Sequence, residues 1–120
     1  MICVEWTGKA WGTNRRLERG KYGNIYANRN YEGFETGLTY LLMSYNAERR
    51  ALAGSVRVHL DFTISAARDI DSLIKPVLDC LQKARVVKND SQITRLFVSK
   101  TAKKKRKEED RIRVTVEEIA

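Results

Sequence analysis

Two stretches of the chain alternate between apolar and polar side chains, the pattern of a half-buried β-strand. The stretch 54–65 alternates throughout, and 111–119 repeats the pattern with a second apolar set. Residues 1–6 and 93–100 also read as strands, on weaker alternation and on β-branched and aromatic content. The apolar positions of the two clearest strands are Val56, Val58, Leu60, Phe62, Ile64, Ile112, Val114 and Val116.

Two other stretches carry apolar residues at the spacing of three and four that predicts an amphipathic helix. The first runs from Tyr31 to a basic end near residues 49–50, and the second spans 69–84. Pro76 lies inside the second stretch, so we expect that helix to begin at about Asp71 or Ser72. The apolar stripes are Phe34, Leu38, Leu41, Leu42 and Tyr45 in the first, and Ile70, Leu73, Ile74, Val77, Leu78 and Leu81 in the second.

The remaining segments are polar. Residues 7–30 are rich in Gly, Asn and basic side chains and read as a long loop, whereas the charge run 102–109 reads as the tip of a hairpin between the last two strands. The fold class expected is therefore α+β: one small domain, residues 1–120, with a mixed β-sheet of about four strands covered by two helices.

The composition narrows the class of partner. The 120 residues include 23 Lys and Arg against 15 Asp and Glu, a formal net charge of +8, which favours a polyanion such as nucleic acid. Neither a leader peptide nor a membrane span is evident, so we expect a cytoplasmic protein without a membrane partner. Cys3 and Cys80 are far apart, which argues against a disulfide or zinc site, and we expect both thiols to be buried.

Cationic residues in the 7–30 loop are candidates for DNA phosphate contact. We favour DNA contact for this loop because it lacks the periodicity of a structural element; for the lysine run after residue 102, protection of a sheet edge and solubility are equally good explanations. The DNA-binding candidates in the loop are Asn14, Arg15, Arg16, Arg19 and Lys21.

Acidic residues at the start of the second helix are candidates for a metal site. Asp69 and Asp71 could bind a divalent cation such as Mg²⁺ or Mn²⁺, which activates water and neutralises phosphate charge. The spacing alone is weak, because about two such acidic pairs are expected by chance at this acidic content. Helix capping and surface ion pairs are the alternative explanation. Lys75 shares the helix face of Asp71, while Asp90 would have to fold back to join them.

The stretch 68–81, RDIDSLIKPVLDCL, together with 89–93, NDSQI, resembles the signature of the RusA family of Holliday junction resolvases, small homodimeric, magnesium-dependent endonucleases often carried by prophages. The resemblance implies that Asp69, Asp71 and Asp90 are catalytic aspartates that bind the metal, and that Lys75 is the essential lysine. We add Arg68, in the same motif, to the DNA-binding candidates. A looser likeness extends to the loop near Asn14 and to the final strands.

Three positions depart from the family pattern. Ser72 stands where the family usually has asparagine, Asn89 replaces the first member of an Asp-Asp pair, and Arg85 stands where glycine is common. Ser72 can still hydrogen-bond near the helix start, and Asp90 keeps the aspartate on which the family's activity depends.

The resemblance implies that a homodimer resolves four-way junctions in DNA recombination and repair by paired nicks, one active site for each of two strands. An alternative is a DNA-binding accessory protein for branched DNA with impaired catalysis, which Asn89 keeps open. An RNA-binding module is weaker, because no RNA-recognition pattern is present.

Overall fold

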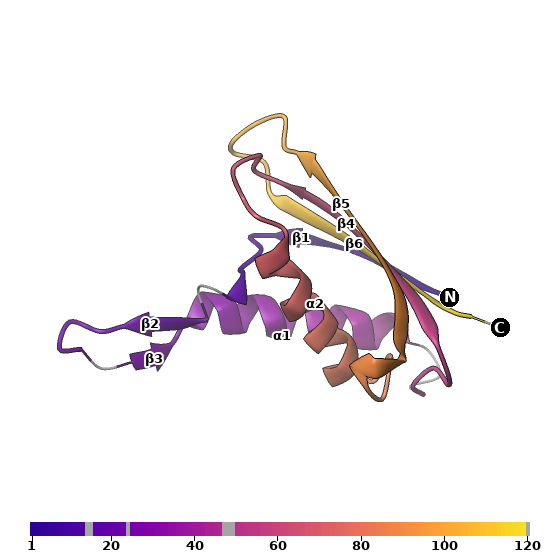
Figure 1. Cartoon of the computed structure of the whole chain (residues 1–120). Helices are drawn as coiled ribbons and strands as arrows, with labels where there is room; N and C mark the ends of the chain where they lie inside the picture. Colours follow the sequence, from indigo (N-terminus) through magenta and orange to yellow (C-terminus); the bar gives the residue numbers. More distant parts are fainter. Residues whose placement is uncertain (14–15, 24, 47–49, 120) are drawn as a thin grey trace.

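A four-stranded sheet with two helices packed on one of its faces forms the body of the protein (Figure 1). The computed structural model describes residues 1–13, 16–23, 25–46 and 50–119. The α+β class, the mixed sheet and the two covering helices are thus as predicted. The elements are β1 (Ile2–Gly8), β2 (Leu17–Arg19), β3 (Ile25–Ala27), α1 (Arg29–Tyr45), β4 (Val56–Ile64), α2 (Asp71–Lys83), the 3-10 helix η2 (Asp90–Gln92), β5 (Ile93–Ala102) and β6 (Asp110–Glu118).

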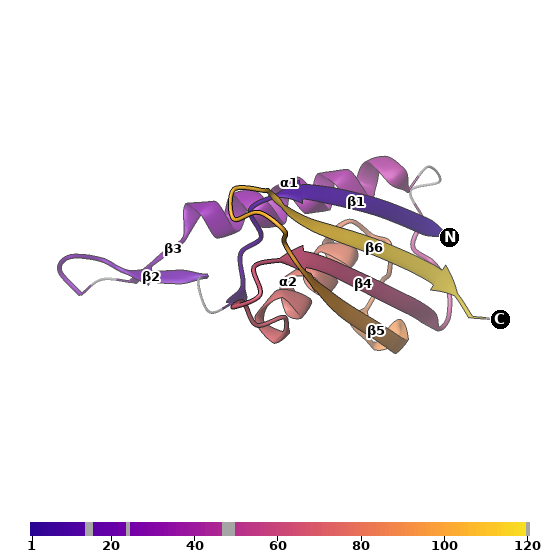
Figure 2. The same ribbon diagram turned by 90° about the horizontal axis from the view of Figure 1, so that it is seen from above.

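The sheet has the strand order β1-β6-β4-β5 (Figure 2). β6 lies antiparallel to both β1 and β4, whereas β5 lies parallel to β4 and forms one edge of the sheet. The predicted hairpin of the last two strands is therefore wrong, because β4 separates them. Alternation along a strand reports which face is buried and not which strand is its neighbour.

The charged segment 103–109 is a crossing connection rather than a hairpin tip. It leads from the end of β5 past the end of β4 to the start of β6 (Figure 2). The Lys103 amide donates to the Ile64 carbonyl at 2.9 Å, which fixes the beginning of the connection against the end of β4. The same connection therefore lies beside the loop 65–70, which leads into α2.

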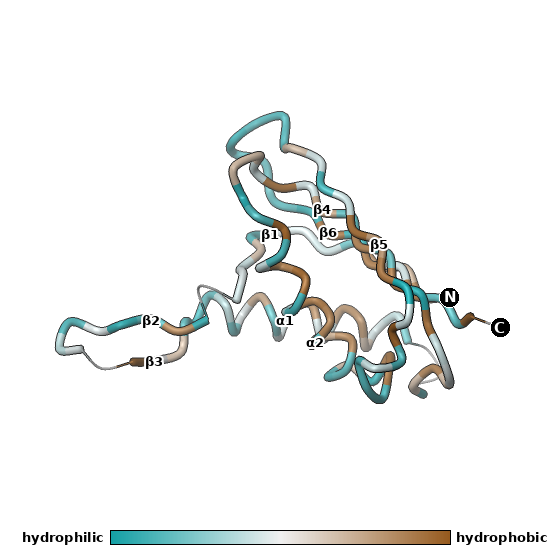
Figure 3. The backbone as a smooth tube through the Cα atoms, in the orientation of Figure 1, coloured by the Kyte–Doolittle hydropathy of each residue, from teal (hydrophilic) through white to brown (hydrophobic). Residues whose placement is uncertain are grey.

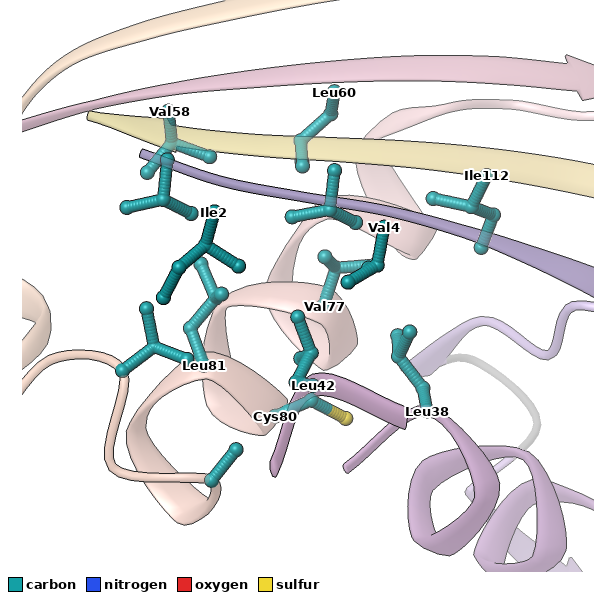
Figure 4. Packing of buried hydrophobic residues seen from close by; sticks show 14 of the residues in the cluster. Ile2, Val4, Leu38, Leu42, Val58, Leu60, Val77, Cys80, Leu81 and Ile112 are labelled. Carbon is teal, nitrogen blue, oxygen red and sulfur yellow. The ribbon is translucent and has the colours of Figure 1, made fainter. Parts of the chain in front are cut away.

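Apolar residues from the sheet and from both helices form one core (Figure 4). The helical stripes predicted from the sequence face this core, with one exception. Phe34, Leu38 and Leu42 of α1 are buried, as are Leu73, Val77 and Leu81 of α2, whereas Tyr45 at the end of α1 is exposed. Burial of aliphatic side chains at about 25 cal/mol per Å² is the main stabilising contribution. The opposite face of the sheet, which we call the open face, carries the polar alternate positions of the strands.

The segment predicted as a long loop contains a small β-hairpin. β2 and β3 pair antiparallel, and the hairpin projects away from the body (Figure 1). Most of β2 and of the turn that follows is hydrophilic (Figure 3). Three-residue strands are too short for a sequence pattern to reveal them. Asn28 joins the hairpin to α1: its amide donates to the Arg16 carbonyl, and its side chain caps the helix through Asn30 N and Tyr31 N.

Both helices differ from their predicted limits at the ends. α1 ends at Tyr45 rather than near 49–50; Asn46 is its C-cap, and residues 47–49 lie outside the described residues. α2 begins at Asp71, as Pro76 predicted. The proline cannot donate to the Ser72 carbonyl four residues earlier. Thr13 Oγ1 makes a long 3.5 Å hydrogen bond to that carbonyl instead.

The two cysteines occupy different environments. Cys80 is buried in the core, as predicted, but Cys3 is exposed, so the prediction for Cys3 is wrong. Cys3 is on β1, whose alternate residues Ile2 and Val4 face the core, and this register turns Cys3 outward. Within the described residues, no helix is long and apolar enough to cross a membrane.

Candidate active site

Asp69 and Asp71 lie where β4 leads into α2. A tight turn, with the Arg68 amide donating to the Ser65 carbonyl at 3.0 Å, carries the chain from the end of the strand to the helix. Asp71 is the first residue of α2 and Asp69 lies two residues before it. This placement follows from the sequence, because the strand pattern ends at Ile64 and Pro76 limits how early the helix can begin.

Helix capping does not account for the two aspartates. The N-cap of α2 is Ile70, which makes no side-chain capping hydrogen bond. The hydroxyl of Ser72 donates to the Asp69 carbonyl at 3.2 Å, which leaves the carboxylate of Asp69 out of this contact. Both aspartates are exposed, and within the described part of the chain neither carboxylate has a hydrogen-bond or ion-pair partner. Two carboxylates are thus available to bind something else.

The two aspartates share a pocket of about 590 Å³ with basic residues. The segment after β1 forms the opposite wall, where Lys9 Nζ lies 4.6 Å from the centre of the Trp11 ring. Carboxylate oxygens and cationic groups in one pocket can bind a divalent cation and a phosphate together. We call it the aspartate pocket; its lining is Lys9, Ala10, Trp11, Ala67, Arg68, Asp69, Asp71 and Ser72.

Asp110 fixes the walls of the aspartate pocket, and the sequence did not single it out. The residue is only 4% exposed, and its carboxylate accepts hydrogen bonds from the Ala10 amide at 2.9 Å and from Arg68 Nη1 at 3.0 Å. Lys103 Nζ approaches the other carboxylate oxygen at 2.9 Å. One buried carboxylate thereby ties together the segment after β1, the turn before α2 and the crossing connection.

Arg68 and Lys100 hold the turn that carries Asp69. Arg68 is paired with Asp110 and also lines the aspartate pocket, together with Asp69 and Asp71. Lys100, on β5, donates to the carbonyls of Ala66 and Arg68 at 3.0 and 2.9 Å. The end of β5 therefore contacts the turn directly, which brings that edge of the sheet close to Asp69.

Lys75 lies one helical turn after Asp71. Its ammonium is 3.5 Å from Asp79 Oδ1, so Lys75 pairs with the aspartate that follows it and not with Asp71. The Lys75 side chain is 68% exposed, and a surface pair of this kind contributes little stability. The ammonium can therefore leave Asp79 at small cost.

Asp90 lies at the far end of α2 from the other two aspartates. The thirteen residues of α2 rise about 20 Å, and η2 follows the helix at its C-terminal end. Asp90 is exposed, and Asn89 before it caps η2 through Ser91 N at 2.9 Å. Of the residues that the structure describes, no three His, Cys, Asp or Glu come together as a metal site. One chain thus brings together two of the three predicted ligands.

The predicted DNA-binding residues lie on two parts of the structure. Arg16, Arg19 and Lys21 are exposed along the projecting hairpin, whereas Arg68 lines the aspartate pocket. Asn14 and Arg15 lie outside the described residues. The hairpin cations and the pocket are joined through residues 9–13, so a bound DNA strand could contact both.

The comparison with protein families identifies the family of the chain. A model of the family described as Endodeoxyribonuclease RusA matches residues 8–117. The chain belongs to the RusA family. No curated protein sequence matches the chain. This RusA-family chain is thus an endodeoxyribonuclease of the Holliday junction type, and its match includes the aspartate pocket, α2 and η2.

Proposed function

We propose that this RusA-family chain, acting as one domain over residues 1–120, cuts junction DNA by divalent-cation-dependent hydrolysis at the aspartate pocket. The observation that carries the proposal is the pair of exposed carboxylates, Asp69 and Asp71, without described partners in a pocket lined by Lys9 and Arg68. Nearby cations favour an anionic substrate, and free carboxylates beside them suit a metal ion that binds that substrate.

The donor set fits Mg²⁺, with Mn²⁺ as a second candidate. Asp69 and Asp71 supply hard carboxylate oxygens, the ligands that these ions prefer, and neither sulfur nor imidazole lines the aspartate pocket within the described residues. A bound divalent cation supplies Lewis-acid stabilisation of the phosphate and lowers the pKa of water. Asp69 and Asp71 would hold it.

Basic side chains around the aspartate pocket have separate roles. Arg68, fixed by Asp110, orients the scissile phosphate, and Lys75 stabilises the charge that develops on that phosphate during hydrolysis. Arg16, Arg19 and Lys21 bind backbone phosphates of the junction arms, and Asn14 and Arg15 belong to the same segment.

A homodimer accounts for the position of Asp90. β5 is an edge strand of ten residues, and on it Leu96 and Phe97 are 40% and 50% exposed. Antiparallel pairing of two β5 strands would place the start of one beside the end of the other. The partner subunit's Asp90, just before its β5, would then approach the turn that Lys100 holds, and so join Asp69 and Asp71.

Two such sites in one dimer suit the substrate. A four-way junction has two strands of like polarity at its crossover, and each site would cut one of them. Paired nicks resolve the junction into two duplexes, which places the protein in DNA recombination and repair, with the cytoplasm as the expected location.

Asp71→Asn tests the proposal. The variant should reduce cleavage of a synthetic four-way junction in Mg²⁺ by about 100-fold or more, because one ligand charge is lost, while junction binding persists. Asp61→Asn is the matched control: the same chemical change on the open face, where Asp61 contacts Ser99 and His59. Nicks are mapped on labelled strands, with EDTA and a linear duplex as reference reactions.

Cleavage by Asp71→Asn at the wild-type rate would contradict the proposed metal site. Equal loss in Asp61→Asn would also contradict it, since that variant leaves the aspartate pocket intact. Wild-type protein that binds the junction but leaves it uncut in both Mg²⁺ and Mn²⁺ would favour the accessory-protein alternative.

A further inference from the structure

A second pocket, of about 640 Å³, lies at the C-terminal end of α2, at the opposite end of that helix from Asp71. We call it the α2-end pocket. Its buried floor is Val87, and three of its residues are cationic. Its lining is Arg50, Ala51, Gln82, Arg85, Val87 and Lys88. None of these residues belongs to the aspartate pocket or to the DNA-binding set predicted from the sequence.

Hydrogen bonds fix the two walls of the α2-end pocket to each other. The buried side-chain amide of Asn46 donates to the carbonyls of both Arg50 and Arg85, at 3.3 and 3.4 Å. The Leu52 amide donates to the Val86 carbonyl at 2.8 Å, which joins the same two segments a little farther along. The two arginines are therefore held beside each other by the scaffold before any ligand binds.

Gln92 extends the same scaffold to Lys88. Its Oε1 accepts from the Lys88 amide at 2.8 Å, and its Nε2 donates to the carbonyls of Leu52 and Gly54 at 2.7 and 2.9 Å. Three cationic residues on two separate chain segments thus have fixed backbones around one pocket. An arrangement of this kind costs little ordering entropy when an anion binds.

The described neighbours of the α2-end pocket do not neutralise its positive charge. Within the described residues, Arg50, Arg85 and Lys88 make no ion pair, whereas the neighbouring Lys83 pairs with Glu35. Cations near a helix C-terminus interact favourably with the helix dipole, and Lys83 in the last turn of α2 already fills that role. The other three cations remain available for an external anion.

The backbone of Arg85 provides an independent observation. Its φ is 57°, the left-handed region, and within the described residues it is the one non-glycine with positive φ. It forms the turn that ends α2, with its amide donating to the Gln82 carbonyl at 3.1 Å. Glycine adopts this conformation without strain, so an arginine is unfavourable here unless its side chain contributes something. The strained residue thus lines the pocket and, among the residues that the structure describes, makes no ion pair.

We propose that the α2-end pocket binds a backbone phosphate of a junction arm through Arg50, Arg85 and Lys88. Planar guanidinium groups match phosphate geometry, and Lys adds a point charge. The pocket lies about 20 Å from Asp71 along α2, a span of roughly six phosphates of one strand. This proposal rests on the proposed function, since the α2-end pocket would be a second binding site for the same DNA.

Arg85→Gly tests the proposal without risking the fold. Because glycine relieves the backbone strain, the melting temperature should stay the same or rise. Loss of one phosphate contact should weaken binding of a four-way junction about 5- to 10-fold at 0.1 M salt and lower the slope of log K against log salt by about 1. Binding is measured in EDTA, so that it does not depend on cleavage.

Arg111→Thr is the matched control. It removes the same charge from an exposed position on the open face, where Arg111 makes no ion pair with any residue that the structure describes, and threonine suits a strand. We expect wild-type affinity and salt slope for the control. An equal loss of affinity in both variants would overturn the proposal, because the loss would then reflect net charge alone. Wild-type affinity of Arg85→Gly for the junction would overturn it as well.

Inorganic phosphate separates DNA from a small anion as the ligand. If phosphate raises the melting temperature of wild-type protein but not of Arg85→Gly, while both bind the junction equally, the pocket holds a small anion and the assignment to DNA is overturned. Failure of wild-type protein to cleave junctions in Mg²⁺ would count against the proposed function and would leave the binding comparison in EDTA unaffected.

Discussion

Asp110 has more influence on the aspartate pocket than its place in a charged run suggests. Asp110→Asn keeps the shape of the side chain but leaves Arg68 and Lys103 without their shared carboxylate. Breaking a mostly buried ion pair costs about 3 kcal/mol, and we expect a loss of that order in the free energy of unfolding, measured in urea. Junction cleavage should fall as well, since Arg68 would no longer be positioned.

Glu109→Gln is the control for that prediction, because Glu109 is the exposed neighbour of Asp110 and the charge change is identical. Unfolding free energies that match wild type in both variants would show that the three contacts of Asp110 contribute no net stability.

The buried thiol of Cys80 should make the folded protein less stable at alkaline pH. Burial in the core raises the pKa of its thiol from 9.0 to about 11. The unfolded chain therefore releases this proton before the folded protein does, so stability is full below pH 9 and falls as the pH rises from 9 to 11. We expect a decrease of about 2 kcal/mol in the free energy of unfolding over that range.

Cys80→Ala serves as the comparison, because it cannot titrate and should show a smaller decrease. Burial also raises the pKa of Tyr31 to about 12, which adds a decrease of the same sign that both proteins share. Identical pH profiles for wild type and Cys80→Ala would contradict the assignment to Cys80.

Single residues differ in how far the sequence could place them. Asp71 could be placed at the start of α2 because a strand pattern precedes it and Pro76 follows it. The sequence could not show that Asp110 is the buried carboxylate, because Glu108 and Glu109 beside it are chemically similar. Only the path of the crossing connection determines which of the three is buried. Burial of this kind depends on long-range contacts that local sequence does not record.

At the scale of elements, the hairpin β2–β3 is the clearest DNA-binding candidate. Replacing Arg16, Arg19 and Lys21 together with alanine should weaken junction binding and reduce the salt slope by up to about 3. The melting temperature should change by no more than a few degrees, because the hairpin projects from the body and all three side chains are exposed.

A triple variant with the same loss of charge on the strands, Arg95, Arg111 and Arg113 to threonine, is the control for the hairpin. Binding and salt slope near wild type for the hairpin variant, measured by titration at several salt concentrations, would contradict a role for the hairpin in DNA binding.

Elements could be predicted better than their pairing. The strands β4 and β6 and the core faces of both helices follow from periodicity, because burial of one face imposes it. The position of β6 between β1 and β4 cannot be predicted from periodicity, since the alternation of Ile112, Val114 and Val116 would suit a hairpin with β5 equally well. The short strands β2 and β3 were missed because three residues carry no periodic signal.

At the scale of the whole molecule, the proposed dimer predicts that two inactive variants rescue each other. Asp71→Asn and Asp90→Asn homodimers should each be inactive. In a mixture, a hybrid dimer would combine intact Asp69 and Asp71 from one chain with Asp90 from the other, which gives one complete site. Nicking should return to about a quarter of the wild-type level, since random exchange makes half of the dimers hybrid.

The control is a mixture of Asp69→Asn and Asp71→Asn. Each of these variants loses a ligand from the same pair, so every site in a hybrid dimer is incomplete and nicking activity should not return. Hybrid dimers can be isolated with two affinity tags. If they do not nick the junction, the shared site is contradicted, and Asp90 does not act together with Asp69 and Asp71 of the other chain.

Pairing of the first strand with the last has a consequence for the synthesis of the protein. Within the described part of the chain, β6 is the one strand that pairs with β1, with Ile2 opposite Val116, and Asp110 at the start of β6 anchors the segment after β1. A ribosome-bound chain cannot complete this sheet edge or the wall of the aspartate pocket until residues 110–118 have left the exit tunnel. This edge of the sheet and this wall of the aspartate pocket are therefore completed late in synthesis.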